Sequence, residues 1–172
     1  MSKAVLGIGS NVGDRLKNLT DAVASLKLLP ATGLLSCSHV YLTEPQGYAD
    51  QDDFFNICLA LETSLSPHAL LGACLGIEAA LGRIRSFKNG PRIIDLDLLL
   101  YESFVSSTKE LTLPHPRLTE RGFVLCPLAE LYPDCVCFGL DFGSALSACS
   151  DQRVVRTDYY YKDTEFVVEV EA

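Results

Sequence analysis

A short apolar segment, residues 93–101, constrains the fold of the chain more than any other stretch. It follows the breaker pair Gly90-Pro91 and reads Ile-Ile-Asp-Leu-Asp-Leu-Leu-Leu-Tyr, which is typical of a strand. Side chains alternate along a strand, so one face is expected to carry Ile94, Leu96, Leu98 and Leu100. The other face then carries Ile93, Asp95, Asp97, Leu99 and Tyr101. Because both faces are mainly apolar, we expect a central strand covered on both sides.

Two carboxylates, Asp95 and Asp97, stand on the same face of this strand, with about 6–7 Å between their α-carbons. Like charges in a half-buried place are costly unless a cation neutralises them. Magnesium often binds between one or two carboxylates and substrate phosphates. The pair therefore predicts a magnesium site on this strand. The alternative is that the carboxylates face water or pair with a structural arginine.

The composition excludes several classes of protein. The chain has 172 residues, 48% of them hydrophobic, which suits one domain or a domain with an extension. A net charge of −8 argues against general nucleic-acid or anionic-membrane binding. Seven cysteines without a Cys-x-x-Cys pair indicate reduced thiols. Since there is neither a signal-like segment nor a long apolar run, we expect a soluble, cytoplasmic protein.

The order of predicted elements indicates an α+β fold. Strands are expected at 3–8, 34–42, 54–62 and 93–101. Helices are expected after the caps Asp14 and Ser66 and before the breakers Pro30 and Gly82. This order is the ferredoxin-like split β-α-β-β-α-β arrangement, with both helices on one face of the sheet. A small hairpin (104–113), short helices (119–131 and 143–149) and two extra strands after Asp151 are expected to follow.

Three connecting segments are expected to lie near the site. The glycines from Gly7 to Gly13 lack the spacing of a nucleotide-binding loop, so we interpret them as a tight strand-to-helix turn. Residues 43–53 and 82–91 form long loops, which are often lids in compact domains. We expect both to be mobile and to order when substrates bind.

Basic residues cluster on either side of the carboxylate strand, although the chain as a whole is acidic. They are Arg83, Arg85, Arg92, Arg117 and Arg121. Guanidinium groups suit a polyphosphate, and the alternative is surface ion pairing, which we favour for Arg117. His115 is held between two prolines; beside a magnesium–phosphate site it would donate to phosphate, and the alternative is a structural or simply exposed histidine. These are the components of phosphoryl transfer by positioning, without a covalent nucleophile.

Four ordered motifs resemble the 6-hydroxymethyl-7,8-dihydropterin pyrophosphokinase family over roughly residues 3 to 131. They are Ile-Gly-Ser-Asn-Val-Gly-Asp from Ile8, the triplet Phe54-Phe55-Asn56, Gly-Pro-Arg-Ile-Ile-Asp-Leu-Asp-Leu-Leu-Leu-Tyr from Gly90, and Leu-Pro-His-Pro-Arg-Leu-Thr-Glu-Arg-Gly-Phe-Val-Leu-Cys-Pro-Leu from Leu113. The resemblance implies transfer of diphosphate from ATP to the pterin hydroxymethyl group, with release of AMP, in folate biosynthesis.

The resemblance also implies a role for each matching residue. Asp95 and Asp97 would hold two magnesium ions, and with Arg83 and Arg92 they form the implied catalytic set. ATP would contact Glu78, Arg85, Arg92, Leu98, Thr112, His115 and Arg121. The pterin would contact Thr43, Phe54, Asn56 and Phe123. Two positions depart from the family pattern: Asn89 replaces a common aromatic residue, and Glu110 replaces a basic residue of some relatives.

The resemblance assigns residues 1–150 to the enzyme domain and leaves residues 151–172 as an extension packed on the same domain. We expect this extension to be dispensable for chemistry, and the protein to be a monomer or a weak homodimer without nucleic-acid or membrane partners. Two rival hypotheses are a non-catalytic sensor of pterin or nucleotide and a metal-dependent nuclease. A sensor would bind without turnover, and a nuclease would cleave nucleic acid.

Overall fold

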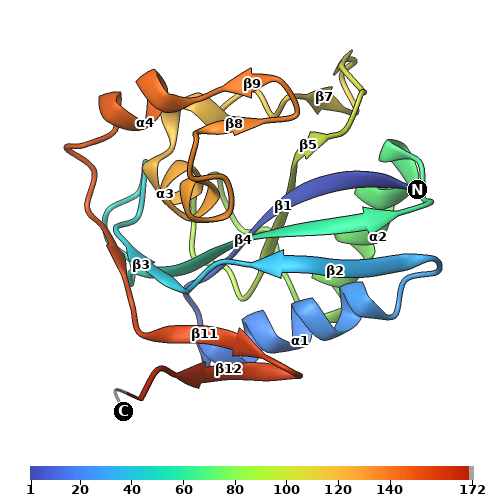
Figure 1. The fold of residues 1–172 in the computed structure, drawn as a ribbon. Helices are drawn as coiled ribbons and strands as arrows, with labels where there is room; N and C mark the ends of the chain where they lie inside the picture. The colour runs from blue at the N-terminus through green and yellow to red at the C-terminus, as the bar shows by residue number, and fades with distance from the viewer. Residues whose placement is uncertain (171–172) are drawn as a thin grey trace.

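A six-stranded antiparallel sheet forms the centre of the protein (Figure 1). The computed structural model describes residues 1–170. Along the sheet the strands follow the order β10-β3-β4-β1-β5, and β2 also pairs with β4. Their bounds are β1 Ser2–Ser10, β2 Thr32–Cys37, β3 Tyr41–Thr43, β4 Phe54–Thr63, β5 Asp95–Tyr101 and β10 Val154–Arg156.

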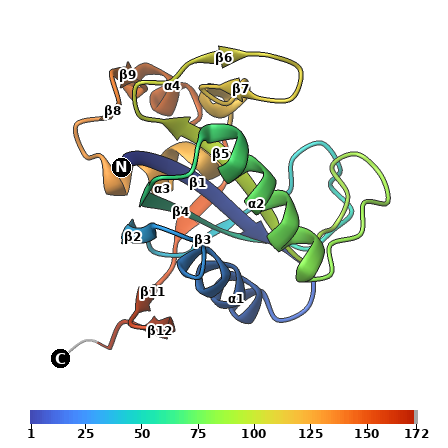
Figure 2. The same ribbon diagram turned by 90° about the vertical axis from the view of Figure 1, so that its right-hand side faces the viewer.

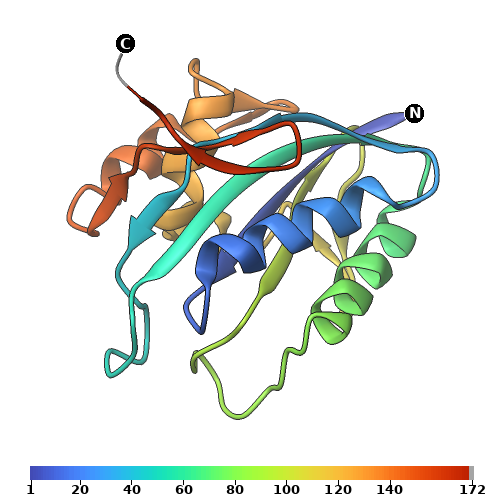
Figure 3. The ribbon, with the colours of Figure 1, turned by 90° about the horizontal axis from the view of Figure 1, so that it is seen from below.

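Two helices, α1 (Arg15–Lys27) and α2 (Pro67–Ala80), lie side by side on one face of the sheet (Figure 3). The predicted caps are confirmed, because Asp14 accepts a hydrogen bond from the Lys17 amide and Ser66 accepts one from the Ala69 amide. The apolar stripes of both helices enter one core with the inward side chains of the sheet. The predicted split β-α-β-β-α-β arrangement is therefore confirmed.

The opposite face of the sheet is also covered, as the two apolar faces of residues 93–101 predicted. Helix α3 (Gly122–Leu131) packs there against β4 and forms a second core with Phe142, which is fully buried. The remaining elements after β5 are short. They are β6 Ser106–Ser107, β7 Thr112–Leu113, the 3₁₀ turn η1 Leu118–Glu120, β8 Val136–Cys137, β9 Leu140–Asp141 and α4 Gly143–Ala148.

Strand β5 departs from the prediction in position and in alternation. Both of its faces are covered, but it is the edge strand beside β1 rather than a central strand. The register with β1 shifts here. Leu98 pairs with Leu6 and Leu100 pairs with Val5, which leaves Leu99 as an extra, unpaired residue in β5. Leu100 therefore joins Leu99 in the second core, and Tyr101 joins Leu98 in the first. The predicted strict alternation is wrong after this bulge.

Two other predictions about local structure are corrected. The predicted strand 34–42 is two strands, β2 and β3, separated at residues 38–40, where Ser38 hydrogen-bonds through its hydroxyl to the Cys58 amide. Gly7 and Gly9 lie inside β1 rather than in a turn. Only Gly13, with φ of 73°, adopts the left-handed backbone of the turn before α1.

The C-terminal segment forms three strands rather than the predicted two. Strand β10 pairs with β3 and thereby extends the central sheet. Strands β11 (Tyr159–Lys162) and β12 (Glu165–Val168) form a hairpin beside α1 (Figure 1). The seven cysteines form no disulfide within residues 1–170, and over the same range no helix has the length and apolar character needed to cross a membrane.

Candidate active site

Three strands bring the predicted site residues into one row across the sheet. Gly9 of β1 pairs with Asn56 of β4 on one side and with Asp95 of β5 on the other, and Gly7 pairs with Asp97. A Cβ atom on Gly9 would collide with Oδ1 of Asn56. Glycine is therefore required here because the Asn56 side chain lies across the strand that separates it from the carboxylates.

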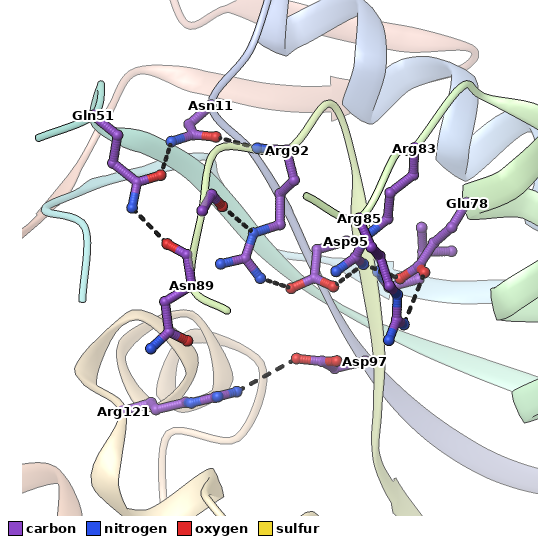
Figure 4. Close-up of polar contacts among 12 residues, drawn as sticks. Asn11, Gln51, Glu78, Arg83, Arg85, Asn89, Arg92, Asp95, Asp97 and Arg121 are labelled. Carbon is purple, nitrogen blue, oxygen red and sulfur yellow. Dashed lines mark hydrogen bonds and ion pairs between the residues drawn. The ribbon is translucent and has the colours of Figure 1, made fainter. Parts of the chain in front are cut away.

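Arginines from three segments surround the two carboxylates (Figure 4). Nη1 of Arg83 donates to Oδ1 of Asp95, and Nη1 of Arg92 lies 3.1 Å from Oδ2 of the same carboxylate. Nη1 of Arg121 lies 3.5 Å from Oδ2 of Asp97. The arginine contacts that we stated as the alternative to a metal site are thus present, and each one comes from a segment that was predicted to bind phosphate.

Glu78 holds the α2 end of this cluster in place. Its side chain is buried, and Oε1 accepts hydrogen bonds from the Leu96 amide at 2.7 Å and from Nη1 of Arg83 at 2.7 Å. Nη2 of Arg85 lies 4.0 Å from Oε2. Burial raises the pKa of Glu78, and the Leu96 amide opposes that shift. Glu78 therefore orients Arg83 and the start of β5 at the same time.

Asp97 is short of neutralising partners. Burial and the nearby Asp95 raise its pKa from 3.8 to about 7, although Arg121 opposes the shift. Within residues 1–170, no group of three or more His, Cys, Asp or Glu side chains is arranged to hold a metal. Two carboxylates alone fit a magnesium ion that takes its remaining ligands from water and from substrate phosphates.

His115 is held as a neutral imidazole. Its backbone amide donates to the Leu99 carbonyl at 2.8 Å, and its Nδ1 accepts from the Arg117 amide at 3.2 Å. Burial and the nearby Arg121 lower its pKa to about 4. Because Nδ1 is an acceptor, the ring proton is on Nε2, where it is available to an acceptor in the site. Arg117 also forms the predicted ion pair, 3.5 Å from Glu120.

Two cavities lie beside the carboxylates. The first, about 230 Å³ in volume, is lined by all four residues predicted to contact the pterin: Thr43, Phe54, Asn56 and Phe123. Nδ2 of Asn56 donates to the Thr43 hydroxyl at 2.7 Å, which fixes the orientation of the amide. The guanidinium groups of Arg92 and Arg121 lie 5.2 and 5.4 Å from the centres of the Phe54 and Phe123 rings. Aromatic faces and an amide edge suit a flat heterocycle.

A second cavity, about 290 Å³, lies between α2, β5 and the β7 region. It is lined by five of the residues predicted to contact nucleotide: Glu78, Arg85, Leu98, Thr112 and His115. Arg83, Arg92 and Arg121 line the first cavity instead. Arg85, Asp95, Asp97 and His115 line both. The carboxylates therefore lie where the two cavities meet. Glu110, one of the departures from the family pattern, also lines the second cavity.

Both predicted lid loops project from the same end of the molecule (Figures 2 and 3). Nδ2 of Asn11 donates to Oε1 of Gln51 at 2.9 Å, and its Oδ1 accepts from the Arg92 amide at 2.8 Å. Gln51 in turn donates to the Asn89 carbonyl at 2.8 Å (Figure 4). The Tyr48 and Phe87 rings meet edge to face, 5.1 Å apart. These contacts join the loops directly.

Sequence reasoning missed some of the residues around the cavities. Asn11 and Gln51 connect the two loops, and Glu44 and Gln46 line the first cavity. Nothing local in the sequence marks them, because each acts through a partner distant in the chain. Gly9 was noticed as part of a glycine-rich stretch, and the register of β1 explains why it is needed.

Comparisons with known proteins find the same kind of enzyme over most of the chain. The family described as 7,8-dihydro-6-hydroxymethylpterin-pyrophosphokinase (HPPK) matches residues 5–133. The chain is 45% identical over 158 residues to 2-amino-4-hydroxy-6-hydroxymethyldihydropteridine pyrophosphokinase of Methylorubrum extorquens, covering 92% of this chain and 100% of that protein. The identity to the Bacillus subtilis protein of the same name is 43% over 153 residues, 89% of this chain and 88% of that one.

Solved structures share the fold. A crystal structure of an HPPK-DHPS in complex with substrates superposes with a TM-score of 0.67 at 13% identity, covering 97% of this chain and 48% of that one. A Plasmodium falciparum HPPK-DHPS triple mutant with pteroate gives a TM-score of 0.68 at 15% identity, with the same coverages. The present chain thus spans about half the length of these solved chains.

Proposed function

The chain belongs to the 7,8-dihydro-6-hydroxymethylpterin-pyrophosphokinase family, and we propose that its two adjoining cavities carry out that family's reaction with magnesium at the junction. The protein is a pyrophosphokinase of folate biosynthesis. It transfers the terminal diphosphate of ATP to the hydroxymethyl group of 6-hydroxymethyl-7,8-dihydropterin and releases AMP. The hydroxymethyl oxygen forms a bond to the β-phosphorus and loses its proton to water, while the bond from that phosphorus to the α–β bridging oxygen breaks and its electron pair stays with AMP.

One observation carries the assignment of roles: Asp95 and Asp97 line both cavities. An acceptor alcohol and a polyphosphate must approach within bonding distance, and such proximity supplies a large part of catalysis. With pterin in the first cavity and nucleotide in the second, the reacting groups meet beside the carboxylates. This division supports the predicted residue sets for the two substrates.

Asp95 and Asp97 are the residues that would hold two magnesium ions. Bound magnesium would neutralise the ATP phosphates and the charge that develops on the α–β bridging oxygen. The shortage of cationic partners around Asp97 supports this assignment, because burial and Asp95 raise its pKa to about 7. A divalent cation would favour the ionised form of both carboxylates.

The arginines and His115 would bind the moving diphosphate. Arg83, Arg92 and Arg121 already lie beside the carboxylates, and their guanidinium groups offer fixed, charge-assisted donors to phosphate oxygens. Neutral His115 would donate from Nε2 without adding a charge. No protein side chain need become covalently modified, because positioning and neutralisation are sufficient for phosphoryl transfer.

The pterin would lie between aromatic faces in the first cavity. Phe54 and Phe123 supply ring surfaces, and the Asn56 amide both donates and accepts at its edge. Thr43 keeps this amide in one orientation through the 2.7 Å hydrogen bond. Displacement of the Arg92 and Arg121 guanidinium groups from the phenyl rings onto phosphate would free both faces for the substrate.

The test is turnover by the metal-depleted protein before and after magnesium is returned. We expect pterin diphosphate to form only with magnesium, ATP and 6-hydroxymethyl-7,8-dihydropterin together. Asp95→Asn and Asp97→Asn should each reduce the response to magnesium, whereas Asp21→Asn, on the exposed side of α1, is the charge-matched control. Binding of pterin without any turnover would support the sensor hypothesis, and cleavage of nucleic acid would support the nuclease hypothesis.

A further inference from the structure

The side chain of Gln152 connects two walls of the first cavity that are distant in sequence. Its Oε1 accepts hydrogen bonds from the Gly122 amide at 2.8 Å and from Nε2 of Gln46 at 2.6 Å. Its Nε2 donates to the Glu120 carbonyl at 3.0 Å. One amide group from the C-terminal segment thus joins the β3–β4 loop to the start of α3.

On the α3 side, Gln152 supplies a missing cap. The N-cap residue, Arg121, makes no side-chain capping hydrogen bond in the described part of the chain, so Oε1 of Gln152 serves the first amide of the helix from outside. The approach is close, since a Cβ atom on Gly122 would lie 3.0 Å from Oε1. Arg121 and Phe123, which flank this amide, both line the first cavity.

On the loop side, the neighbouring residue Arg153 reinforces the connection. Its amide donates to Oε1 of Glu44 at 2.9 Å, and its carbonyl accepts from the Glu44 amide at 3.2 Å. Its guanidinium binds both carboxylate oxygens of Asp53 at 2.9 Å. Residues 152–153 therefore fix both ends of the β3–β4 loop, and Gln46, which lines the cavity, lies between them.

The Arg153–Asp53 ion pair and the Gln152 hydrogen bonds differ in how strongly they hold the loop. The Arg153–Asp53 pair is largely exposed on its arginine side, so solvent and salt weaken it. Gln152 is half-buried and makes three hydrogen bonds, and the loss of its carbonyl would leave the Gly122 amide without its acceptor. Gln152 therefore makes the better shielded of the two connections between the loop and the rest of the fold.

We infer that Gln152 is a positioning residue for the pterin substrate, which it serves by holding Gln46 against the first turn of α3. This inference rests on the proposed function, because it assumes that pterin occupies the first cavity. It also replaces the expectation that residues 151–172 are dispensable for chemistry. Gln152 acts through Gln46, Gly122 and the residues beside them rather than by contact with the substrate.

The kinetic test compares Gln152→Ala with two other variants. We expect Gln152→Ala to raise the KM for pterin about tenfold, the loss that corresponds to one good hydrogen bond, and to change the KM for ATP less than about twofold. Gln152→Glu retains the acceptor for Gly122 and Gln46 but loses the donor to the Glu120 carbonyl, so its pterin KM should rise less than that of Gln152→Ala. Asp151→Ala, exposed and next in the chain, should match wild type.

Amide hydrogen exchange supplies a measurement that needs no turnover. In Gln152→Ala, exchange should accelerate at Gly122 and across residues 44–53, and Gln152→Glu, which keeps the acceptor, should restore part of the protection. If Gln152→Ala does not fold, Gln46→Ala tests the same bond: it should accelerate exchange in the loop and leave Gly122 protected. An unchanged pterin KM with unchanged exchange, or equal rises in both KM values, would overturn the inference. A wild-type protein that forms no AMP would instead contradict the proposed function.

Discussion

Arg83 shares one guanidinium nitrogen between two carboxylates: Nη1 lies 2.7 Å from Oε1 of Glu78 and also donates to Asp95. Glu78 is buried and cannot move far, so it fixes the arginine at the junction of the two cavities. If diphosphate replaces Asp95 as the partner of Arg83, the arginine need only exchange one anion for another. Glu78 would then set the position from which Arg83 acts.

Arg83→Ala should lower kcat about 10²- to 10³-fold, the usual effect of removing one donor to developing charge. The fold should survive, because Arg83 lies in a loop and Asp95 keeps Arg92 as an ion-pair partner. Steady-state kinetics with both substrates saturating measures the effect. Arg117→Ala, whose partner is the exposed Glu120, is the control and should change kcat less than about threefold. Equal effects of the two substitutions would contradict the assigned role.

Asp97→Asn should abolish turnover while it leaves the fold intact. The amide keeps the shape of the carboxyl group but loses the charge that binds a cation. We expect kcat to fall by at least about 10²-fold, measured as pterin diphosphate formed at saturating magnesium. Retention of activity within about tenfold of wild type, a barrier change of about 1.4 kcal/mol, would exclude the role.

Asp97 should also make the stability of the metal-free wild-type protein depend on pH, and Asp97→Asn tests this. The pKa of Asp97 is raised from 3.8 to about 7 on folding, so the folded state binds more protons than the unfolded state between these values. The free energy of unfolding contributed by this group is therefore highest below pH ~4 and declines as pH rises through 7. Asp97→Asn removes this decline.

Thermal unfolding in a chelator at pH 5 and pH 8 measures the difference. Relative to wild type, Asp97→Asn should become progressively more stable as pH rises, because the wild-type protein must then bury an ionised carboxylate. A difference in unfolding temperature that is independent of pH would show that Asp97 titrates near its ordinary value.

Gly9→Ala should weaken pterin binding specifically. A Cβ atom at this position collides with Oδ1 of Asn56, so the amide that is assigned to the pterin edge must move. We expect a rise of about tenfold or more in the KM for pterin, with a smaller change for ATP. Gly33→Ala in β2, where a Cβ atom would meet no neighbour within 4 Å, is the matched control. Similar kinetics for the two variants would refute the placement of the pterin.

The two loops, residues 43–53 and 82–91, should become protected together when substrates bind. They are already joined through Gln51 and Asn89 and through the Tyr48–Phe87 contact, so one should not close without the other. Amide exchange with an ATP analogue and pterin measures this, and Gln51→Ala should uncouple the loops. Protection that is unchanged by both ligands would show that the loops are not lids.

The sequence was sufficient where the chemistry is local. Asp95 and Asp97 are two residues apart on one strand, and the caps Asp14 and Ser66 act within three residues. It was insufficient where position depends on pairing between distant segments. The extra residue Leu99 in β5 reverses the orientation of Leu100, and only the register with β1 reveals it.

The same limit applies to the site. The four residues predicted for pterin line the first cavity and five of those predicted for nucleotide line the second, whereas Arg92 and Arg121 line the first. The connections of Asn11 with Gln51 and of Gln152 with Gln46 join residues 40 and 106 positions apart. No periodicity or cap signals such contacts, because each depends on how the β3–β4 loop lies against the rest of the fold.

The fate of each ATP phosphate tests the central claim most directly. The protein is incubated with magnesium, 6-hydroxymethyl-7,8-dihydropterin and ATP labelled at either the α- or the γ-phosphate, and the products are separated. We predict that the γ-label appears in a diphosphorylated pterin, that the α-label remains in AMP, and that the two products form in equal amounts. ADP with a monophosphorylated pterin would mean attack at the γ-phosphorus and would contradict the account.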